Sequence, residues 1–253
     1  MNRSYETVPR RKVSDVSVTL GTEHFTEANA LVREALGKAA TVEIREAFAQ
    51  RYLGCGMQAG KTLLIHGVPG NDMACYMDGG EIEVFGNAQD QIGNTMNDGL
   101  VIVHGRCGDA AGYGMRGGKI FVRDGCGWRV GIHMKQFEDK RPAIVIGGDA
   151  GSFLGEYMAG GVIVLLGKPG RYLATGMHGG VIYLRHELAL EEVPKGLVQG
   201  AVDDADKAIV RSLLIEYNAH FSDDLGYGVD TSGEGFFRLR PASFRPYASM
   251  YAN

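Results

Sequence analysis

The sequence repeats with a period of about 19 residues, and this period constrains the fold more than any other feature. Seven of the ten methionines form a ladder whose successive gaps are 20, 19, 19, 19, 24 and 19 residues. The third residue before each of them is glycine or alanine, and the third residue after is glycine except at Phe137. The ladder comprises Met57, Met77, Met96, Met115, Met134, Met158 and Met177.

Short β-prone runs follow these glycines, as in EIEVFG at 81–86, LVIVHG at 100–105 and VIVLLG at 162–167. Such a unit is too short for a βαβ crossover of about 30 residues or a propeller blade of about 40. Identical strand–turn units with short links stack in parallel only when the chain winds into a coil. The sequence therefore predicts an all-β fold, a single-stranded right-handed parallel β-helix (β-solenoid) of about seven coils.

Alternate residues of each strand should point into this solenoid, with the methionines filling its corners. The residues predicted to carry the core are Ile82, Val84, Val101, Val103, Ile120, Val122, Ile163, Val164, Leu165, Ile182 and Leu184.

Three segments follow from this pattern. Residues 1–45 form an N-terminal segment with a capping helix at 25–37, for which Thr26 is the expected N-cap and Gly37 the stop. Residues 46–200 form the β-helix, and residues 201–253 a C-terminal helix and extended tail. Residues 203–221 are amphipathic, with Ala205, Ile209, Leu213 or Leu214 and Tyr217 on one face. The aromatic last thirty residues either fold back on the solenoid or, the alternative we favour, reach onto a partner subunit.

The 24-residue gap contains an insertion near residues 136–140. Insertions in solenoids form loops that project from one face, often the binding face. This loop is either such a site or a tolerated surface loop.

Composition excludes several classes of function. The net charge of −4 disfavours nucleic-acid binding, which needs concentrated Lys and Arg. The first residues lack the apolar region of a secretory signal, and no apolar run is long enough to span a membrane. With only four cysteines, we expect a cytoplasmic protein.

The cysteines occupy repeating positions. Cys55 and Cys75 both lie two residues before their methionine, and Cys107 and Cys126 both lie eight before theirs. Each pair should stack in neighbouring coils, within disulfide range. No CxxC is present and no histidine shares either position, so we interpret them as small apolar residues of the ladder rather than a metal or redox site.

The pair Asp90 and Asp109, both six before their methionine, should also stack. Two adjacent carboxylates suit a retaining glycosidase. However, stacked polar residues at coil corners more often bind backbone donors, which is the interpretation we prefer.

Other candidates point to no chemistry. His104, His133 and His178 occupy different positions of the repeat. None has Ser, Cys and Asp partners at a spacing that indicates a nucleophilic site. The glycine strings at 114–118 and 147–155 lack the phosphate-loop pattern and open no predicted helix. The sequence thus assigns no catalytic, cofactor-binding or metal-binding residue.

The pattern G-x-x-M-x-G-G followed by a strand resembles the GXGXG domain of glutamate synthase, especially its archaeal-type separate subunit. The resemblance is carried by VGIHMKQFEDKRPAIVIGG (130–148), FLGEYMAGGVIVLLG (153–167) and GMHGGVIYLR (176–185). In that family an amidotransferase domain releases ammonia from glutamine, and a flavin-bearing synthase domain adds it to 2-oxoglutarate. The resemblance implies that the β-helix is a structural spacer between these catalytic domains.

The resemblance implies that catalysis lies on other polypeptides. This chain begins Met1-Asn2 rather than with a nucleophilic cysteine, lacks clustered cysteines for an iron–sulfur centre and has no room for an FMN-binding barrel. We therefore expect no cofactor on this chain, with FMN and iron–sulfur on partner subunits.

The resulting hypothesis is a non-catalytic, scaffolding subunit of a glutamate-synthase-type complex. Its partners would be a glutamine amidotransferase subunit and an FMN-binding synthase subunit, with neither nucleic acid nor membrane involved. The alternatives are the equivalent subunit of another complex, similar to the β-helix subunit of formylmethanofuran dehydrogenase, a stand-alone carbohydrate-active β-helix enzyme, or a regulatory module that binds a small ligand between coils.

Overall fold

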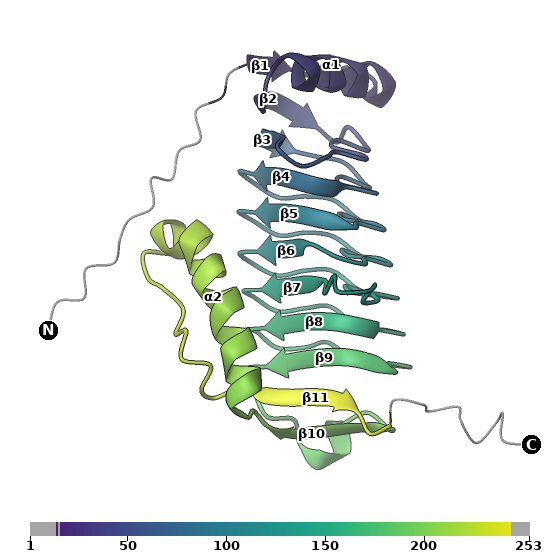
Figure 1. Cartoon of the computed structure of the whole chain (residues 1–253), viewed down its shortest axis with the longest axis vertical. Coiled ribbons are helices and arrows are strands. Elements are labelled where there is room, and N and C mark those ends of the chain that lie inside the picture. The colour runs from purple at the N-terminus through teal and green to yellow at the C-terminus, as the bar shows by residue number, and fades with distance from the viewer. Residues whose placement is uncertain (1–13, 15, 244–253) are drawn as a thin grey trace, which may run out of the picture.

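The computed structural model describes Ser14 and residues 16–243. Within these residues the chain winds into a parallel β-solenoid of about eight turns, with strands stacked in one sheet (Figure 1). The predicted fold class is confirmed, and the number of coils is approximately as predicted. The parallel strands are β1 (Val16–Thr19), β2 (Thr41–Phe48), β3 (Thr62–Val68), β4 (Asp78–Val84), β5 (Asp98–Val103), β6 (Lys119–Val122), β7 (Ala143–Ile146), β8 (Ala159–Leu165) and β9 (Gly179–Leu184).

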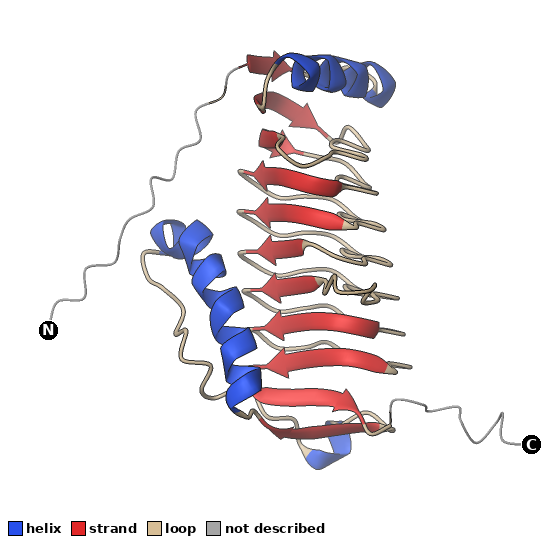
Figure 2. Ribbon diagram, viewed as in Figure 1, coloured by secondary structure: helices blue, strands red, loops and turns tan. Residues whose placement is uncertain are grey.

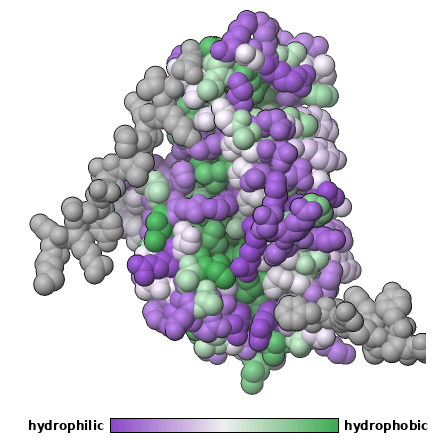
Figure 3. Space-filling model, viewed as in Figure 1, coloured by the Kyte–Doolittle hydropathy of each residue, from purple (hydrophilic) through white to green (hydrophobic). Residues whose placement is uncertain are grey.

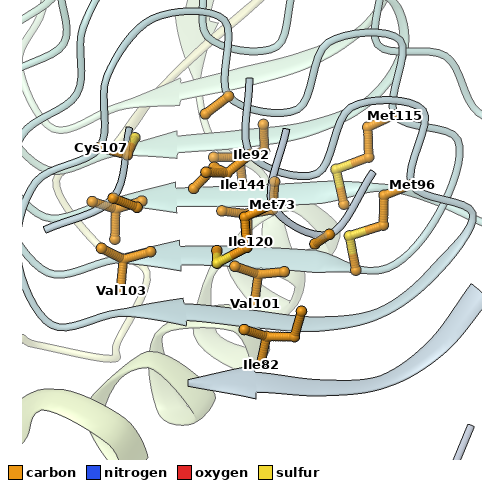
Figure 4. Packing of buried hydrophobic residues seen from close by; sticks show 14 of the residues in the cluster. Met73, Ile82, Ile92, Met96, Val101, Val103, Cys107, Met115, Ile120 and Ile144 are labelled. Atoms are coloured by element: carbon orange, nitrogen blue, oxygen red, sulfur yellow. The ribbon is translucent and has the colours of Figure 1, made fainter. Parts of the chain in front are cut away.

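The sheet forms one wall of the solenoid, and its inward side chains stack in continuous ladders. Ile82 pairs with Val101, Val101 with Ile120 and Ile120 with Ile144, so each residue packs on its copy one coil away (Figure 4). The repeating methionines are buried in the same core. The predicted core is confirmed except that Val164 lies on the outer side of the sheet, because side chains alternate between faces.

The opposite wall consists of return segments, each comprising a repeating methionine and the six residues before it. They run behind the strands (tan in Figure 2) and hydrogen-bond to one another through their backbones. For example, the amides of Gly93 and Gly112 each donate a 2.8 Å hydrogen bond to the preceding coil. Both walls are therefore paired from coil to coil.

Left-handed backbone recurs along the return segments and explains the small residue before each methionine. Gly93 has φ +66°, and a Cβ there would lie 2.6 Å from Cδ1 of Ile120 in the next coil. Gly112 has the same relationship to Ile144. The positive φ favours glycine here, although Ala74 and Ala174 also adopt it at the corresponding positions, and the close approach of the next strand leaves no room for a Cβ at Gly93 and Gly112.

The N-terminal end carries α1 (Phe25–Lys38), as predicted, although its N-cap is His24 rather than Thr26. The side chain of His24 accepts a hydrogen bond from the Thr26 amide, and the C-cap is Ala39, beyond the expected stop. Nζ of Lys61 donates to the carbonyls of Leu36 and Ala39, which satisfies the end of the helix. The sheet continues beside this helix through β1 and β2.

The second helix, α2 (Asp204–Leu225), lies against the outer side of the sheet (Figure 1). Asp203 caps it and accepts a hydrogen bond from the Asp206 amide. Its buried face differs from the predicted one, since Ala205 is exposed and Val210 is buried where Ile209 is only partly buried. The helix residues buried against the outer faces of Ile102, Phe121, Val145, Val164 and Tyr183 are Val210, Leu213, Leu214, Tyr217 and Phe221.

The C-terminal end of the sheet is closed by antiparallel pairing. After the short 3₁₀ helix η1 (Leu190–Glu192), β10 (Leu197–Ala201) and β11 (Phe237–Pro241) complete the sheet, and β11 lies between β9 and β10. The sequence did not predict these strands. Residues 237–241 thus fold back on the solenoid, contrary to the alternative we favoured, whereas residues 244–253 of the tail lie outside the described part.

Candidate functional site

The cysteines form two stacked pairs, as their spacing predicts. Sulfur atoms of Cys107 and Cys126 are 3.1 Å apart in neighbouring coils, and all four cysteines are free thiols. The hydrogen bond between these two thiols, together with burial, raises the pKa of Cys126. Burial and the neighbouring Cys55 likewise raise the pKa of Cys75. Cys75, Cys107 and Cys126 are buried and fill ladder positions of the solenoid, whereas Cys55 is exposed at its end of the ladder.

The carboxylates of Asp90 and Asp109 are occupied by backbone donors. Oδ1 of Asp90 accepts a 2.8 Å hydrogen bond from the amide of Asp109, and Oδ1 of Asp109 accepts one of 2.7 Å from the amide of Trp128. Asn71 accepts from the Asp90 amide in the same way. This ladder satisfies the amides at successive coil corners, which gives both carboxylates a structural role in place of the glycosidase role.

The glycine strings also belong to the coil corners. Gly117 and Gly118 lead directly into β6, and a Cβ on Gly118 would lie 2.7 Å from the carbonyl oxygen of Gly99. Gly147 and Gly148 follow β7 and press on the backbone of the preceding coil. Neither string opens a helix, so neither combines its amides with a helix terminus.

The three histidines considered above lie in different environments. His133 stacks on Tyr157, with ring centroids 5.3 Å apart, and Nδ1 of His178 lies 3.1 Å from the carbonyl oxygen of Gly176. His104 is the exception, because its largely buried imidazole bridges the sheet and α2. Its Nε2 lies 2.8 Å from Oε1 of Glu83, and its Nδ1 hydrogen-bonds Asp224 near the end of the helix.

The 19-residue spacing around His104 is a sequence signal that the predictions above do not use. His66, Phe85, His104 and Arg123 recur every 19 residues, each directly after an inward-facing strand residue. The Phe85 ring stacks on both His66 and His104, at 4.8 and 5.2 Å between centroids. The remaining partner, Asp224, lies 120 positions further along the chain, and no local pattern could reveal it.

Electrostatics favour the charged form of His104. Burial lowers its pKa, but the hydrogen bonds to Glu83 and Asp224 and their negative charges outweigh burial, and the net shift is upward. Arg123 also contacts Asp224, at 3.4 Å. A shallow hollow of about 410 Å³ is lined by Phe85, Gly86, His104, Arg123 and Asp224. The contacts of His104 and Arg123 with Asp224 fasten the end of α2 to the sheet.

The insertion at 136–140 folds back over earlier coils. Lys140 lies 3.4 Å from a carboxylate oxygen of Asp78 and 3.6 Å from one of Asp98, while Phe137 is exposed beside it. A second shallow hollow, of about 470 Å³, lies between the last return segment and Leu188 and Glu192. Among the described residues, no group of three or more His, Cys, Asp or Glu side chains is arranged to hold a metal ion. Nor is any described helix both long and apolar enough to cross a membrane.

The repeat is the feature that this chain shares with known proteins. The sequence pattern described as the GXGXG motif matches residues 13–229, most of the chain and all of the solenoid's parallel strands. The chain belongs to the GXGXG family. It is also similar to the uncharacterized protein MJ1350 of Methanocaldococcus jannaschii, with 53% identity over 147 residues. That alignment covers 56% of this chain and 56% of the relative, so the chain spans about half the length of the curated relative it matches.

The GXGXG glycines have a defined place in the coil. In the return segments a side chain on Gly93, Gly112, Gly131 or Gly155 would collide with the next coil, and at the corners before the strands one on Gly80, Gly99, Gly118 or Gly161 would collide with the preceding coil. These glycines thus set how closely the coils stack.

Proposed function

We propose that this GXGXG protein is a non-catalytic structural subunit of a glutamate-synthase-type complex, which carries out glutamine-dependent reductive amination of 2-oxoglutarate. The observation that supports this most is membership of the GXGXG family by a chain whose candidate chemical groups are used structurally. The cysteines fill ladder positions, the aspartates bind backbone amides, and His104 fastens a helix.

The physical role proposed for the subunit is to hold catalytic partners at a fixed distance. Both walls of the solenoid are hydrogen-bonded from coil to coil, and the interior is filled by continuous ladders of apolar side chains. Bending such a rod would require breaking bonds in one wall or opening gaps in a close-packed core. A stiff spacer of this kind suits an enzyme in which ammonia released at one site must be used at another.

The proposed partners are a glutamine amidotransferase subunit and an FMN-binding synthase subunit. The synthase subunit would bind FMN, and iron–sulfur centres would reside on the partners, because the cysteines of this chain stack in pairs rather than in a cluster of four. We place the complex in the cytoplasm, in keeping with the free thiols.

Co-purification from the native host tests the proposal. A tagged copy of the full chain should recover an amidotransferase and an FMN protein, identified by mass spectrometry, and the recovered complex should form glutamate from glutamine and 2-oxoglutarate. Recovery of formyl-transfer subunits instead would assign the chain to a complex similar to formylmethanofuran dehydrogenase. Polysaccharide cleavage by the isolated chain would reject a structural role.

A further inference from the structure

The two cysteine pairs differ in their access to solvent. Cys107 and Cys126 are both buried in the main core of the solenoid, where Figure 4 shows Cys107 beside the strands. In the other pair Cys55 is exposed, whereas Cys75 is buried but belongs to neither apolar cluster. This second pair is therefore open to solvent through one of its members.

Backbone hydrogen bonds hold Cys55 and Cys75 side by side in neighbouring return segments. The amide of Gly56 donates a 2.9 Å hydrogen bond to the carbonyl oxygen of Cys75. On the other side, the amide of Ala74 donates one of 2.9 Å to the carbonyl oxygen of Leu53. Segments paired in this way lie about 4.8 Å apart. This spacing falls within the Cα separation that a disulfide bridges, about 4.4–6.8 Å.

The surface around Cys55 leaves room for a small molecule. A Cβ on Gly56, the next residue, would have no other part of the protein within 4 Å. The long helix α2 lies on the other side of the solenoid, where it packs on the apolar band visible over the sheet in Figure 3. A reagent of low molecular weight can therefore reach the sulfur of Cys55.

The different burial of the two thiols gives them different parts in a reaction. Burial and the neighbouring Cys55 raise the pKa of Cys75, and a thiol that stays protonated is a poor nucleophile. The exposed Cys55 is thus the thiol that an external reagent meets first. Cys75 needs no access to the reagent, because its own target is the adjacent sulfur of Cys55. The inner pair, Cys107 and Cys126, has no exposed member that could begin such a reaction.

We propose that Cys55 and Cys75 form a reversible modification site, at which a disulfide of low molecular weight oxidises the pair to a disulfide that fastens two neighbouring coils. This inference goes beyond the proposed function and does not depend on it. It also departs from the packing role that the spacing of this pair indicates. A disulfide formed in a reducing compartment is usually transient, which is in keeping with a reversible reaction.

The reaction is two successive thiol–disulfide exchanges. Cys55 loses its proton to solvent, and its thiolate attacks one sulfur of the reagent, which releases the other half of the reagent as a thiolate. Cys75 then loses its proton, and its sulfur attacks Sγ of Cys55 and displaces the remaining half of the reagent. The two cysteines give up two electrons to form one disulfide, and the reagent takes up the same two electrons to become two thiols.

The consequence for the fold follows from what the disulfide encloses. Residues 56–74 would lie within the closed loop, and they contain all of β3. If the solenoid unwinds from its N-terminal end past this coil, the unwound segment is then a closed loop with fewer conformations than a free chain. Oxidation therefore makes opening of this coil less favourable, whereas α2 lies outside the loop.

The test treats the full chain with glutathione disulfide, alkylates the remaining thiols after denaturation and maps all four cysteines by mass spectrometry. We expect one disulfide, between Cys55 and Cys75, which dithiothreitol reverses, with both inner cysteines alkylated. Cys75→Ser should accumulate a glutathione adduct on Cys55, and Cys55→Ser should leave Cys75 unmodified. The matched control is Cys126→Ala, which imitates Ala150 of the next coil and should form the disulfide at the wild-type rate. Circular dichroism checks that each variant is folded.

Hydrogen exchange measures the effect on the coil. We expect the amides of β3 to exchange at least about tenfold more slowly in the oxidised protein than in the reduced protein, with those of α2 unchanged. Equal exchange of β3 in the two forms would overturn the proposal. So would a wild-type protein that carries only a glutathione adduct on Cys55, that links two copies through Cys55, that oxidises only its inner pair, or that does not react.

Discussion

At the scale of single residues, the coil spacing is controlled by pairs formed between a return segment and the strand of the next coil. Gly54, Gly93, Gly112, Gly131 and Gly155 each approach Cδ1 of an isoleucine within 2.8 Å of a hypothetical Cβ. Ala74 replaces glycine at the corresponding position before Met77. The strand residue that corresponds to the isoleucine in this pair is Val101, which has no Cδ1. The extra methyl group on one side thus coincides with a missing methyl group on the other.

This pairing predicts a compensating double mutant. Gly93→Ala should destabilise the protein by about 1–3 kcal/mol, because its Cβ would collide with Cδ1 of Ile120. Ile120→Val alone should cost about 0.5–1.5 kcal/mol. The double variant recreates the natural Ala74–Val101 pair and should be more stable than the sum of the single changes allows, by about 1 kcal/mol or more. Urea unfolding of the four proteins measures the coupling, and strict additivity would contradict the pairing.

The residues that could be placed correctly from sequence are those that obey the repeat. Methionines, small residues and strand positions recur because each coil presents the same environment to the next, so phase alone reveals them. Val164 lies on the outer side of the sheet, and the sequence does not show this because residues 162–166 are an unbroken apolar run in which hydrophobicity does not distinguish the two faces. The His104–Asp224 contact escaped because one partner lies in the repeat and the other in α2, and periodicity contains no information about such pairs.

At the scale of elements, α2 is attached to the sheet by an apolar face along its length and by charged contacts at both ends and in the middle. Arg238 pairs with Asp203 and Asp206 at its beginning, and Lys119 pairs with Glu216 further along. His104 and Arg123 hold Asp224 near its end. Both helices were predictable from amphipathic spacing, although the capping residues of α1 are His24 and Ala39 rather than the predicted ones. The side of the solenoid that α2 covers, and the closing strands β10 and β11, were not, because they depend on contacts with distant coils.

The contact between His104 and α2 predicts a pH-dependent stability. The pKa of His104 is raised in the folded protein, so its charged form contributes stability that is fully present below its unfolded pKa near 6.5 and is lost as pH rises through the folded pKa. His104→Gln should therefore cost more at about pH 6 than at about pH 9, with a loss of about 1.5–3 kcal/mol at the lower pH.

Thermal unfolding at the two pH values, with hydrogen exchange of the last turn of α2, provides the measurement. His178→Gln serves as the control, since the ring of His178 contacts the Gly176 carbonyl and lies in no ion pair among the described residues. An equal destabilisation by His104→Gln at both pH values would show that the imidazole acts by packing and neutral hydrogen bonding alone.

At the scale of the whole molecule, the solenoid is a one-dimensional stack in which each coil contacts its neighbours. A complete coil can therefore be removed without disturbing the others, provided that the phase is kept. Residues 69–87 form such a unit, because Pro69 and Ala88 both lie eight residues before a repeating methionine. Their deletion joins Val68 to Ala88 and brings β3 beside β5, which keeps Leu63 next to Val101 in the inward ladder.

We expect the protein lacking residues 69–87 to fold cooperatively and to be less stable by about 1–3 kcal/mol, the share of a segment of this length in an ordinary domain. After the deletion Gly54 faces Val101 in place of Ile82, which creates a small gap but no collision. The matched control is deletion of residues 69–78, which removes fewer residues but leaves too little chain for the return segment, so that β4 cannot stack in phase on β3. Circular dichroism and thermal unfolding should show the larger deletion folded and the smaller one unfolded. The reverse order would mean that the individual loops, rather than the phase of the ladders, determine whether the coils stack.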